Sequence, residues 1–170
     1  MSQKITRRRF MQAGAAVLAV AALTACGGNT PSPSTSTART LGDLTFDVTK
    51  GDDTATESDG IYERNYLAKL SVKNGSAAQA VAMKDVKFAM ELEDGTELTA
   101  IASSKYEGRN ELQPLVVAPQ GSVEGWVGFG YQSTKREELQ ISYLTIVYAG
   151  KKVTYKVDGD IITAGGVTEA

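Results

Sequence analysis

Apolar and polar residues alternate along several short stretches of this chain. Residues 66–72 and 86–92 place apolar side chains at every second position, with one apolar exception in the first stretch. Successive side chains of a strand point to opposite faces, so each stretch predicts a β-strand with one packed face and one largely solvated face. Residues 44–48 and 153–157 predict the first and last strands, and no segment shows a sustained helical period.

Glycine-containing pairs separate these stretches. Asp94-Gly95 follows the 86–92 stretch and permits the positive φ angles of a tight hairpin turn. Asn74-Gly75 and Ala149-Gly150 mark further turns. Several short strands divided by such turns are typical of an antiparallel sandwich. We therefore predict an all-β domain over residues 41–158, which is long enough to form a core without disulfides.

Residues 1–25 have the pattern of an export signal. Residues 1–9 carry four basic side chains and no acidic one, and residues 13–25 form an apolar stretch. A stretch of about thirteen residues fits the hydrophobic region of a signal peptide and is too short to span a bilayer. We therefore expect residues 1–25 to be removed from the mature protein.

Two motifs in this segment resemble known export signals. Arg7, Arg8 and Phe10 match the twin-arginine export motif, with a plain basic segment for the general secretory route as the alternative. Residues 23–26, Leu-Thr-Ala-Cys, resemble the bacterial lipobox, in which the cysteine sulfur is joined to diacylglycerol and the chain is cut before it. The alternative is ordinary signal cleavage near an unrelated cysteine.

Lipidation is the better interpretation of Cys26. It is the only cysteine in the chain, and a lone exposed thiol is unfavourable in an oxidising compartment. A diacyl group supplies the two chains that stable membrane attachment requires. The predicted location is the cell membrane, with the protein lipid-anchored and facing the extracytoplasmic side.

The mature chain is acidic. Loss of the four basic residues of the signal leaves 14 basic against 20 acidic residues, a net charge of −6. No basic stripe remains to neutralise phosphates, which argues against nucleic-acid binding. Residues 26–40 are rich in Gly, Ser, Thr and Pro and predict a flexible tether. Residues 159–170 predict a loose C-terminal tail.

The most distinctive segment is 118–129, Ala-Pro-Gln-Gly-Ser-Val-Glu-Gly-Trp-Val-Gly-Phe. With residues 66–74 and 92–95, it resembles an immunoglobulin-like domain of unknown function found in many Gram-positive lipoproteins. That group shares a superfamily with the mycobacterial immunoprotective extracellular antigen. In this chain Gln120 interrupts the Pro-Gly turn of the family. The resemblance implies an immunoglobulin-like antiparallel β-sandwich behind the signal peptide and tether, and it brings no catalytic residues.

Few side chains offer catalytic chemistry. The chain has no histidine, which removes the usual general base near neutral pH and the commonest metal ligand. Ser103, Ser104 and Lys105 are adjacent but are better explained as solvated loop residues, and the acids form no recognisable catalytic pair. We expect no enzymatic activity, with an accessory role in a cell-envelope enzyme system as an alternative.

An acidic cluster near residue 55 offers one candidate metal site. Asp52, Asp53, Glu57 and Asp59 are predicted to form a single loop closed by Gly60. Calcium prefers clustered oxygen ligands, although this spacing does not fit an EF-hand. A plain solvated hairpin loop is the main interpretation, and a calcium-dependent adhesion domain using these four residues is the alternative.

Three residues are candidates for partner binding. In the strand that follows Val123, Trp126 falls on the face opposite the apolar residues, where it forms a binding platform or covers neighbouring glycines. Tyr106 and Arg109 lie on a long connection, the kind of segment that often carries recognition on a rigid sandwich.

These observations together predict a lipid-anchored, extracytoplasmic binding or interaction module at the cell surface. Its expected partner is another envelope protein or a wall polymer. The expected cofactor set is empty apart from the covalent diacylglycerol on Cys26 and the calcium alternative.

Overall fold

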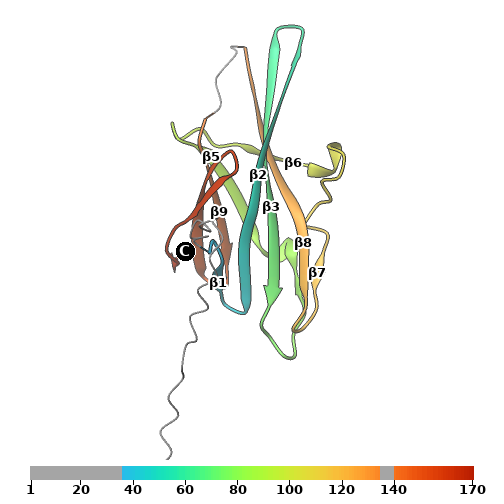
Figure 1. Cartoon of the computed structure of the whole chain (residues 1–170), viewed down its shortest axis with the longest axis vertical. Helices are drawn as coiled ribbons and strands as arrows, with labels where there is room; N and C mark the ends of the chain where they lie inside the picture. The colour runs from blue at the N-terminus through green and yellow to red at the C-terminus, as the bar shows by residue number, and fades with distance from the viewer. Residues whose placement is uncertain (1–35, 135–139) are drawn as a thin grey trace, which may run out of the picture. The chain divides into compact units, whose positions relative to one another are not determined.

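Antiparallel strands make up most of this computed structural model, which describes residues 36–134 and 140–170 (Figure 1). The predicted export motifs, Cys26 and the tether up to residue 35 lie outside the described residues. The strands within the described ranges are, in chain order, β1 (Arg39–Leu41), β2 (Leu44–Ser58), β3 (Ile61–Asn74), β4 (Val81–Ala82), β5 (Lys87–Leu92), β6 (Thr99–Ile101), β7 (Val116–Val117), β8 (Ser122–Ser133), β9 (Ser142–Tyr148), β10 (Lys151–Asp158), β11 (Ile161–Ala164) and β12 (Thr168–Glu169).

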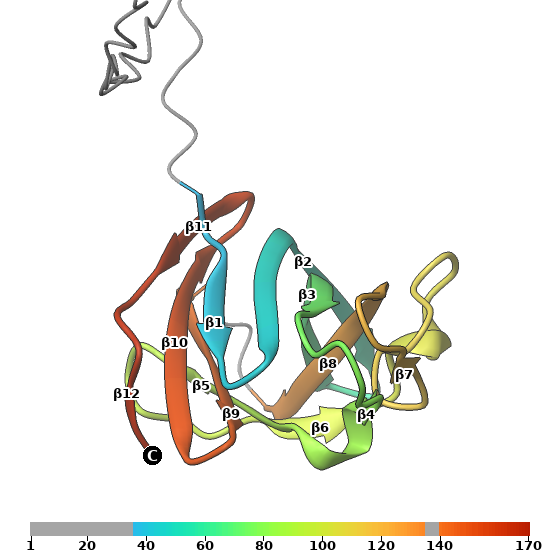
Figure 2. The same ribbon diagram turned by 90° about the horizontal axis from the view of Figure 1, so that it is seen from below.

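The strands form two main sheets. The first has the order β1-β2-β3-β8-β6, and the second has the order β11-β10-β9-β5 with β12 beside β10. A separate pair, β4 and β7, completes the set. Figure 2 shows the two sheets as layers, with β1 lying between β2 and β10.

The topology is that of an immunoglobulin-like sandwich. Without the additional strands β1, β4, β7, β11 and β12, seven strands remain. In chain order, the first, second, fifth and fourth of these form one sheet, and the third, sixth and seventh form the other. This is the strand arrangement of a constant-type immunoglobulin domain. The predicted all-β sandwich is therefore confirmed.

The core lies between the two sheets and follows the predicted alternation. On β3, Tyr66, Ala68, Leu70 and Val72 are 5% exposed or less. Their partners from the second sheet include Tyr155, which is fully buried and donates a hydrogen bond from its hydroxyl to the Phe46 carbonyl oxygen at 3.0 Å. Burial raises the pKa of Tyr155 well above its ordinary value, because the charged phenolate is costly in an apolar environment.

The β2–β3 hairpin is longer than the sequence pattern predicts. β2 continues to Ser58, and the turn consists of Asp59 and Gly60, with φ angles of 52° and 75°. The predicted acidic loop is therefore wrong, because Asp52, Asp53 and Glu57 lie on a strand with only Asp59 in the turn. Continuous antiparallel pairing with β3 keeps these polar residues extended. Figure 1 shows the tip of this hairpin extending past the second sheet.

The C-terminal residues are also more ordered than predicted. Residues 161–164 pair with the end of β10 as β11, and residues 168–169 pair with its beginning as β12. The predicted loose tail over 159–170 is therefore wrong. At the other end, β1 begins at Arg39, inside the segment predicted as tether, and the Arg39 side chain donates to the carbonyl oxygens of Ala164 and Gly165.

The turn before β8 accommodates Gln120 in a left-handed conformation, with a φ of 55°. Gly121 N–H donates to the Ala118 carbonyl oxygen at 2.9 Å, so a tight turn forms despite the residue inserted into the Pro-Gly pair. The Gln120 side-chain amide also donates to the Gly75 carbonyl oxygen at 2.5 Å. The turn is thereby held against the β3–β4 connection.

Helical structure in the described ranges is limited to two single 3₁₀ turns, η1 (Met83–Asp85) and η2 (Ser103–Lys105). Neither of them has the length or hydrophobicity needed to cross a membrane. The described residues fall within one compact unit, Thr35–Ala170, and its buried apolar cluster lies between Leu41 and Val157. All residues of the buried apolar cluster therefore belong to this one compact unit.

Candidate functional site

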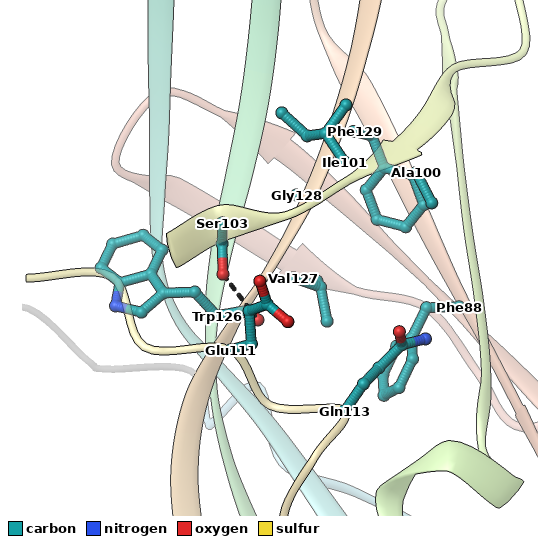
Figure 3. Close-up of a pocket in the computed structure, with 10 residues that line it drawn as sticks. All are labelled: Phe88, Ala100, Ile101, Ser103, Glu111, Gln113, Trp126, Val127, Gly128 and Phe129. Carbon is teal, nitrogen blue, oxygen red and sulfur yellow. Dashed lines mark hydrogen bonds between the residues drawn. The ribbon is translucent and has the colours of Figure 1, made fainter. Parts of the chain in front are cut away.

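Trp126 lies on the outer face of the first sheet, as predicted. On β8, Val127 and Phe129 point into the core and are 6% and 3% exposed. Figure 3 shows the Trp126 ring on the opposite side of β8 from Val127. The outward positions after Trp126 are Gly128 and Gly130, so the outer surface of β8 has little side-chain cover of its own.

The segment that connects β6 to β7, residues 102–115, runs along β8 and extends the edge of the sheet. Trp126 N–H donates to the Asn110 carbonyl oxygen at 2.8 Å, and Leu112 N–H donates to the Trp126 carbonyl oxygen at 2.9 Å. Leu112 is fully buried, and a Cβ on Gly125 would lie only 2.7 Å from its Cα. The glycine therefore permits the close approach of this connecting segment to β8.

Arg109 fastens the connecting segment to the outer face. Its Nε donates to Asp52 Oδ2 at 3.0 Å and its Nη2 donates to the same oxygen, while Nη1 donates to the Glu107 carbonyl oxygen at 2.8 Å. The guanidinium carbon also lies 5.5 Å from the centre of the Trp126 ring. Charge-assisted hydrogen bonds and a cation–π contact therefore converge on one side chain. We call Arg109, Asp52 and Trp126 the arginine clamp.

One outward-facing position beside the arginine clamp is unusually well buried. Leu67 pairs with Asp52 on one side and Gly128 on the other, so it faces outward, yet it is 1% exposed. A Cβ on Gly128 would meet Ile101 and Leu67 at 3.1 and 3.2 Å. Leu67 and Ile101 therefore cover Gly128, and Arg109 rather than an open ring face occupies the position above Trp126.

Two of the three predicted binding residues are thus brought together, and the third lies close in the chain. Tyr106 is half-buried in the connecting segment, and its carbonyl oxygen accepts a hydrogen bond from Arg109 N–H at 3.2 Å. Its hydroxyl has no hydrogen-bond partner within residues 36–134 and 140–170. Tyr106 is therefore the predicted binding residue whose polar group is still available for a ligand.

The hydroxyls of the Ser-Ser-Lys run hold the connecting segment. Ser103 is 1% exposed, and its Oγ lies 3.2 Å from the Arg109 carbonyl oxygen. It also lies 3.3 Å from the Trp126 carbonyl oxygen, the contact drawn in Figure 3. Ser104 Oγ donates to Glu111 Oε1 at 2.5 Å. These contacts give both serines a structural role.

The four predicted calcium ligands are not gathered at one point. Asp52 is bound to Arg109, and Asp53 Oδ2 lies 3.6 Å from Arg64 Nη2. The rise of an extended strand separates Asp52 from Glu57 by about 16 Å. Within the described ranges, no group of three or more acidic, histidine or cysteine side chains is placed to hold a metal ion.

Two hollows flank β6. The one in Figure 3 opens between the sheets beside Glu111, Gln113 and Phe88, and its volume of about 40 Å³ has room for one or two water molecules. The other lies on the outer face and has a volume of about 420 Å³. We call it the polar hollow, and it is lined by Glu63, Asn65, Thr99, Ile101, Lys105, Gly130, Tyr131 and Gln132. Sequence reasoning missed these residues, although two glycines at alternate positions of one strand are a signal for a thinly covered sheet face.

Comparison with known proteins adds little beyond the fold. No protein-family model matches the sequence, and the search of curated proteins found no match. A solved structure that is similar is an uncharacterised β-sandwich protein from Clostridium difficile 630, at 14% identity and a TM-score of 0.45. The match covers 71% of this chain and 89% of that protein. Similarity at this level carries no argument about function.

Proposed function

We propose that this chain is a lipid-anchored, extracytoplasmic binding module of the immunoglobulin-like lipoprotein type. The observation that carries the proposal is the arginine clamp, which holds the connecting segment on the outer face of a packed sandwich. Segments fixed on a rigid scaffold bind with a lower ordering cost than free loops. The recognition surface in this proposal is the connecting segment around Tyr106 and the sheet face beside it.

The predicted lipid site limits where such a module works. The compact unit begins at Thr35, nine positions after Cys26. A fully extended chain of that length spans about 30 Å. A diacylglycerol group on Cys26 therefore keeps the sandwich close to the outer surface of the membrane, and the ligand belongs to the envelope: a membrane protein, a wall polymer or a molecule that reaches this layer.

A binding function also suits the chemistry of the chain. The absence of histidine leaves no side chain that titrates near neutral pH without a perturbed environment. The acidic character of the mature chain favours partners other than nucleic acid. A protein or a wall polymer is therefore the partner class that we propose.

The proposed lipidation and membrane location are tested by labelling cells with a radioactive fatty acid. The wild-type protein should carry label and sediment with membranes, whereas Cys26→Ser should carry none. An unlabelled wild-type protein in the soluble fraction would show that the lipid assignment is wrong. Replacing both Arg7 and Arg8 by Lys tests the route, because this change should block twin-arginine export and leave general secretion intact.

The binding surface is tested with residues 27–170, labelled with a fluorophore and added to cells that lack their own copy. Saturable binding is expected, and Tyr106→Ala should weaken it about tenfold or more, as loss of a central aromatic contact does. Tyr143→Ala is the matched control, because Tyr143 is another half-buried tyrosine, on β9 of the second sheet. Equal weakening by both variants, or no saturable binding, would contradict the proposal.

A further inference from the structure

One row of residues across the outer face carries no apolar side chain. By register, Thr54 of β2 lies beside Asn65 of β3, which lies beside Gly130 of β8, which lies beside Thr99 of β6. The neighbouring row consists of Asp52, Leu67, Gly128 and Ile101, and Leu67 and Ile101 cover Gly128. The polar row instead runs along the floor of the polar hollow, which Asn65, Gly130 and Thr99 border.

Asn65 presents an acceptor that the protein itself does not satisfy. The residue is 1% exposed, and its Nδ2 donates to Glu63 Oε1 at 3.2 Å. Because the Glu63 carboxylate can only accept, this bond fixes the orientation of the amide. Asn65 Oδ1 then has no hydrogen-bond partner, and neither does the buried Oγ1 of Thr54.

The unsatisfied Asn65 oxygen lies at the floor of the polar hollow. A Cβ at position 130 would overlap Asn65 Oδ1, so this oxygen lies directly above the Gly130 Cα on the outer side of the sheet. Buried polar atoms are almost always hydrogen-bonded, and an exception calls for an explanation. The two exceptions are register neighbours, and Asn65 borders the hollow, so together they indicate a site that a ligand or a bound water completes.

The rim determines the chemical class of that ligand. Glu63 and Lys105 contribute one charge of each sign, and Thr99 and Gln132 contribute neutral donors and acceptors. A metal ion would meet Lys105, and an anion would meet Glu63. A hydroxyl group both donates and accepts, so it can bond to Asn65 Oδ1 and to the rim at once.

From these observations we propose that the polar hollow binds a neutral, hydroxyl-bearing sugar segment. Its volume falls in the range of small-ligand sites. The inference rests on the proposed function and deepens it, because it names a glycan as the class of envelope ligand. The sugar hydroxyls supply the donor that Asn65 Oδ1 lacks, and the missing side chain at Gly130 leaves the space above its Cα to that oxygen.

The test is an NMR titration of ¹⁵N-labelled residues 27–170 with maltotriose and, separately, with triacetylchitotriose. Shifts should concentrate on Thr99, Gly130 and the side-chain amide of Asn65. Lys105→Ala and Gln132→Ala alter exposed side chains, and each should weaken binding about fivefold, the effect of one lost hydrogen bond. Lys87→Ala is the control: it removes an exposed lysine on the second sheet and should leave the affinity unchanged.

Three outcomes would overturn the proposal: no shifts at millimolar concentrations of either sugar, shifts spread over both sheets, or shifts produced by calcium and by neither sugar. The binding of the wild type and of Tyr106→Ala to cells is a separate measurement, so the two proposals can fail independently. Saturable, Tyr106-dependent cell binding without sugar shifts refutes the sugar site alone. Sugar shifts without cell binding refute the proposed recognition of the envelope and leave the sugar site standing.

Discussion

The two faces of β3 are buried in different ways. On the inner face, Leu70 and Val72 pack against the second sheet, within a cluster to which many strands contribute. On the outer face, Leu67 is equally well buried, although it lies outside that cluster, in a row with Asp52, Gly128 and Ile101. The difference shows that apolar periodicity describes burial by a neighbouring layer, whereas the burial of a single outward-facing side chain such as Leu67 leaves no periodic trace.

The largest effect is expected from damage to the inner face. Phe46 is fully buried, and Phe46→Ala should lower the free energy of unfolding by about 3–5 kcal/mol through lost burial and the cavity left behind. Urea denaturation measures the change. Thr45→Ala on the outer side of the same strand is the control and should stay within about 0.5 kcal/mol. Similar losses for both variants would contradict the contrast between the faces.

Gly130→Ala should be the most damaging change on the outer face. The added Cβ would overlap Asn65 Oδ1, and Asn65 is nearly fully buried, so the amide must move or the strands must separate. Overpacking of this kind should lower the free energy of unfolding by about 2–3 kcal/mol. Thermal or urea unfolding gives the value. Gly166→Ala has free space around its Cβ and should be neutral; a loss as large at Gly166 would exclude the proposed clash.

Breaking the arginine clamp should have a smaller effect. Arg109→Ala removes the bonds to Asp52 and the contact with Trp126, with an expected loss of about 1–2 kcal/mol. Arg109→Lys should recover little of it, because a lysine cannot reproduce the planar guanidinium. A double-mutant cycle with Asp52→Asn isolates the pair. Strict additivity of the two substitutions would mean that the pair contributes no coupling.

The smallest effect is expected from removing the buried hydroxyl of Tyr155 on the inner face. Tyr155→Phe deletes the hydrogen bond to the Phe46 carbonyl oxygen, at a cost of about 1 kcal/mol near neutral pH. The raised pKa of Tyr155 means that its contribution is fully present below the ordinary tyrosine value of 10.0 and is lost as the pH rises beyond it. The urea midpoint should therefore fall less between pH 8 and pH 11 in Tyr155→Phe than in the wild type. An equal fall in both proteins would show that the pKa of Tyr155 is the same in the folded and unfolded states.

Much of the sandwich could be predicted, because its inner-facing strands obey a period of two. The hairpin at Asp94-Gly95 also follows from turn chemistry: Gly95 has a φ of 84°, and Asp94 Oδ1 accepts from Thr96 N–H at 2.9 Å. The Thr96 side chain, and secondarily this backbone contact, lower the pKa of Asp94 from its ordinary value. The far half of the β2–β3 hairpin could not be predicted, because its polar residues are held extended by pairing rather than by burial.

The candidate site was only partly accessible from the sequence. The face of Trp126 follows from strand alternation, and the connecting segment stands out by its length. The pairing of Arg109 with Asp52 has no local signal, because the two residues are 57 positions apart. The role of Asn65 was equally hidden, since an unsatisfied oxygen depends on which strand lies beside it.

The separation between Arg109 and Asp52 also has a consequence for the order of assembly. Residues next to the Asp59-Gly60 turn meet across a few positions of chain, so the β2–β3 hairpin closes at little entropic cost. Arg109 finds both of its partners only after β8 has joined β3, because the clamp needs Trp126 and Asp52 on adjoining parts of one sheet. The contact is therefore made late in folding. Residues 102–115 should also detach from the sheet more readily than the core strands, so limited proteolysis should cut this segment first.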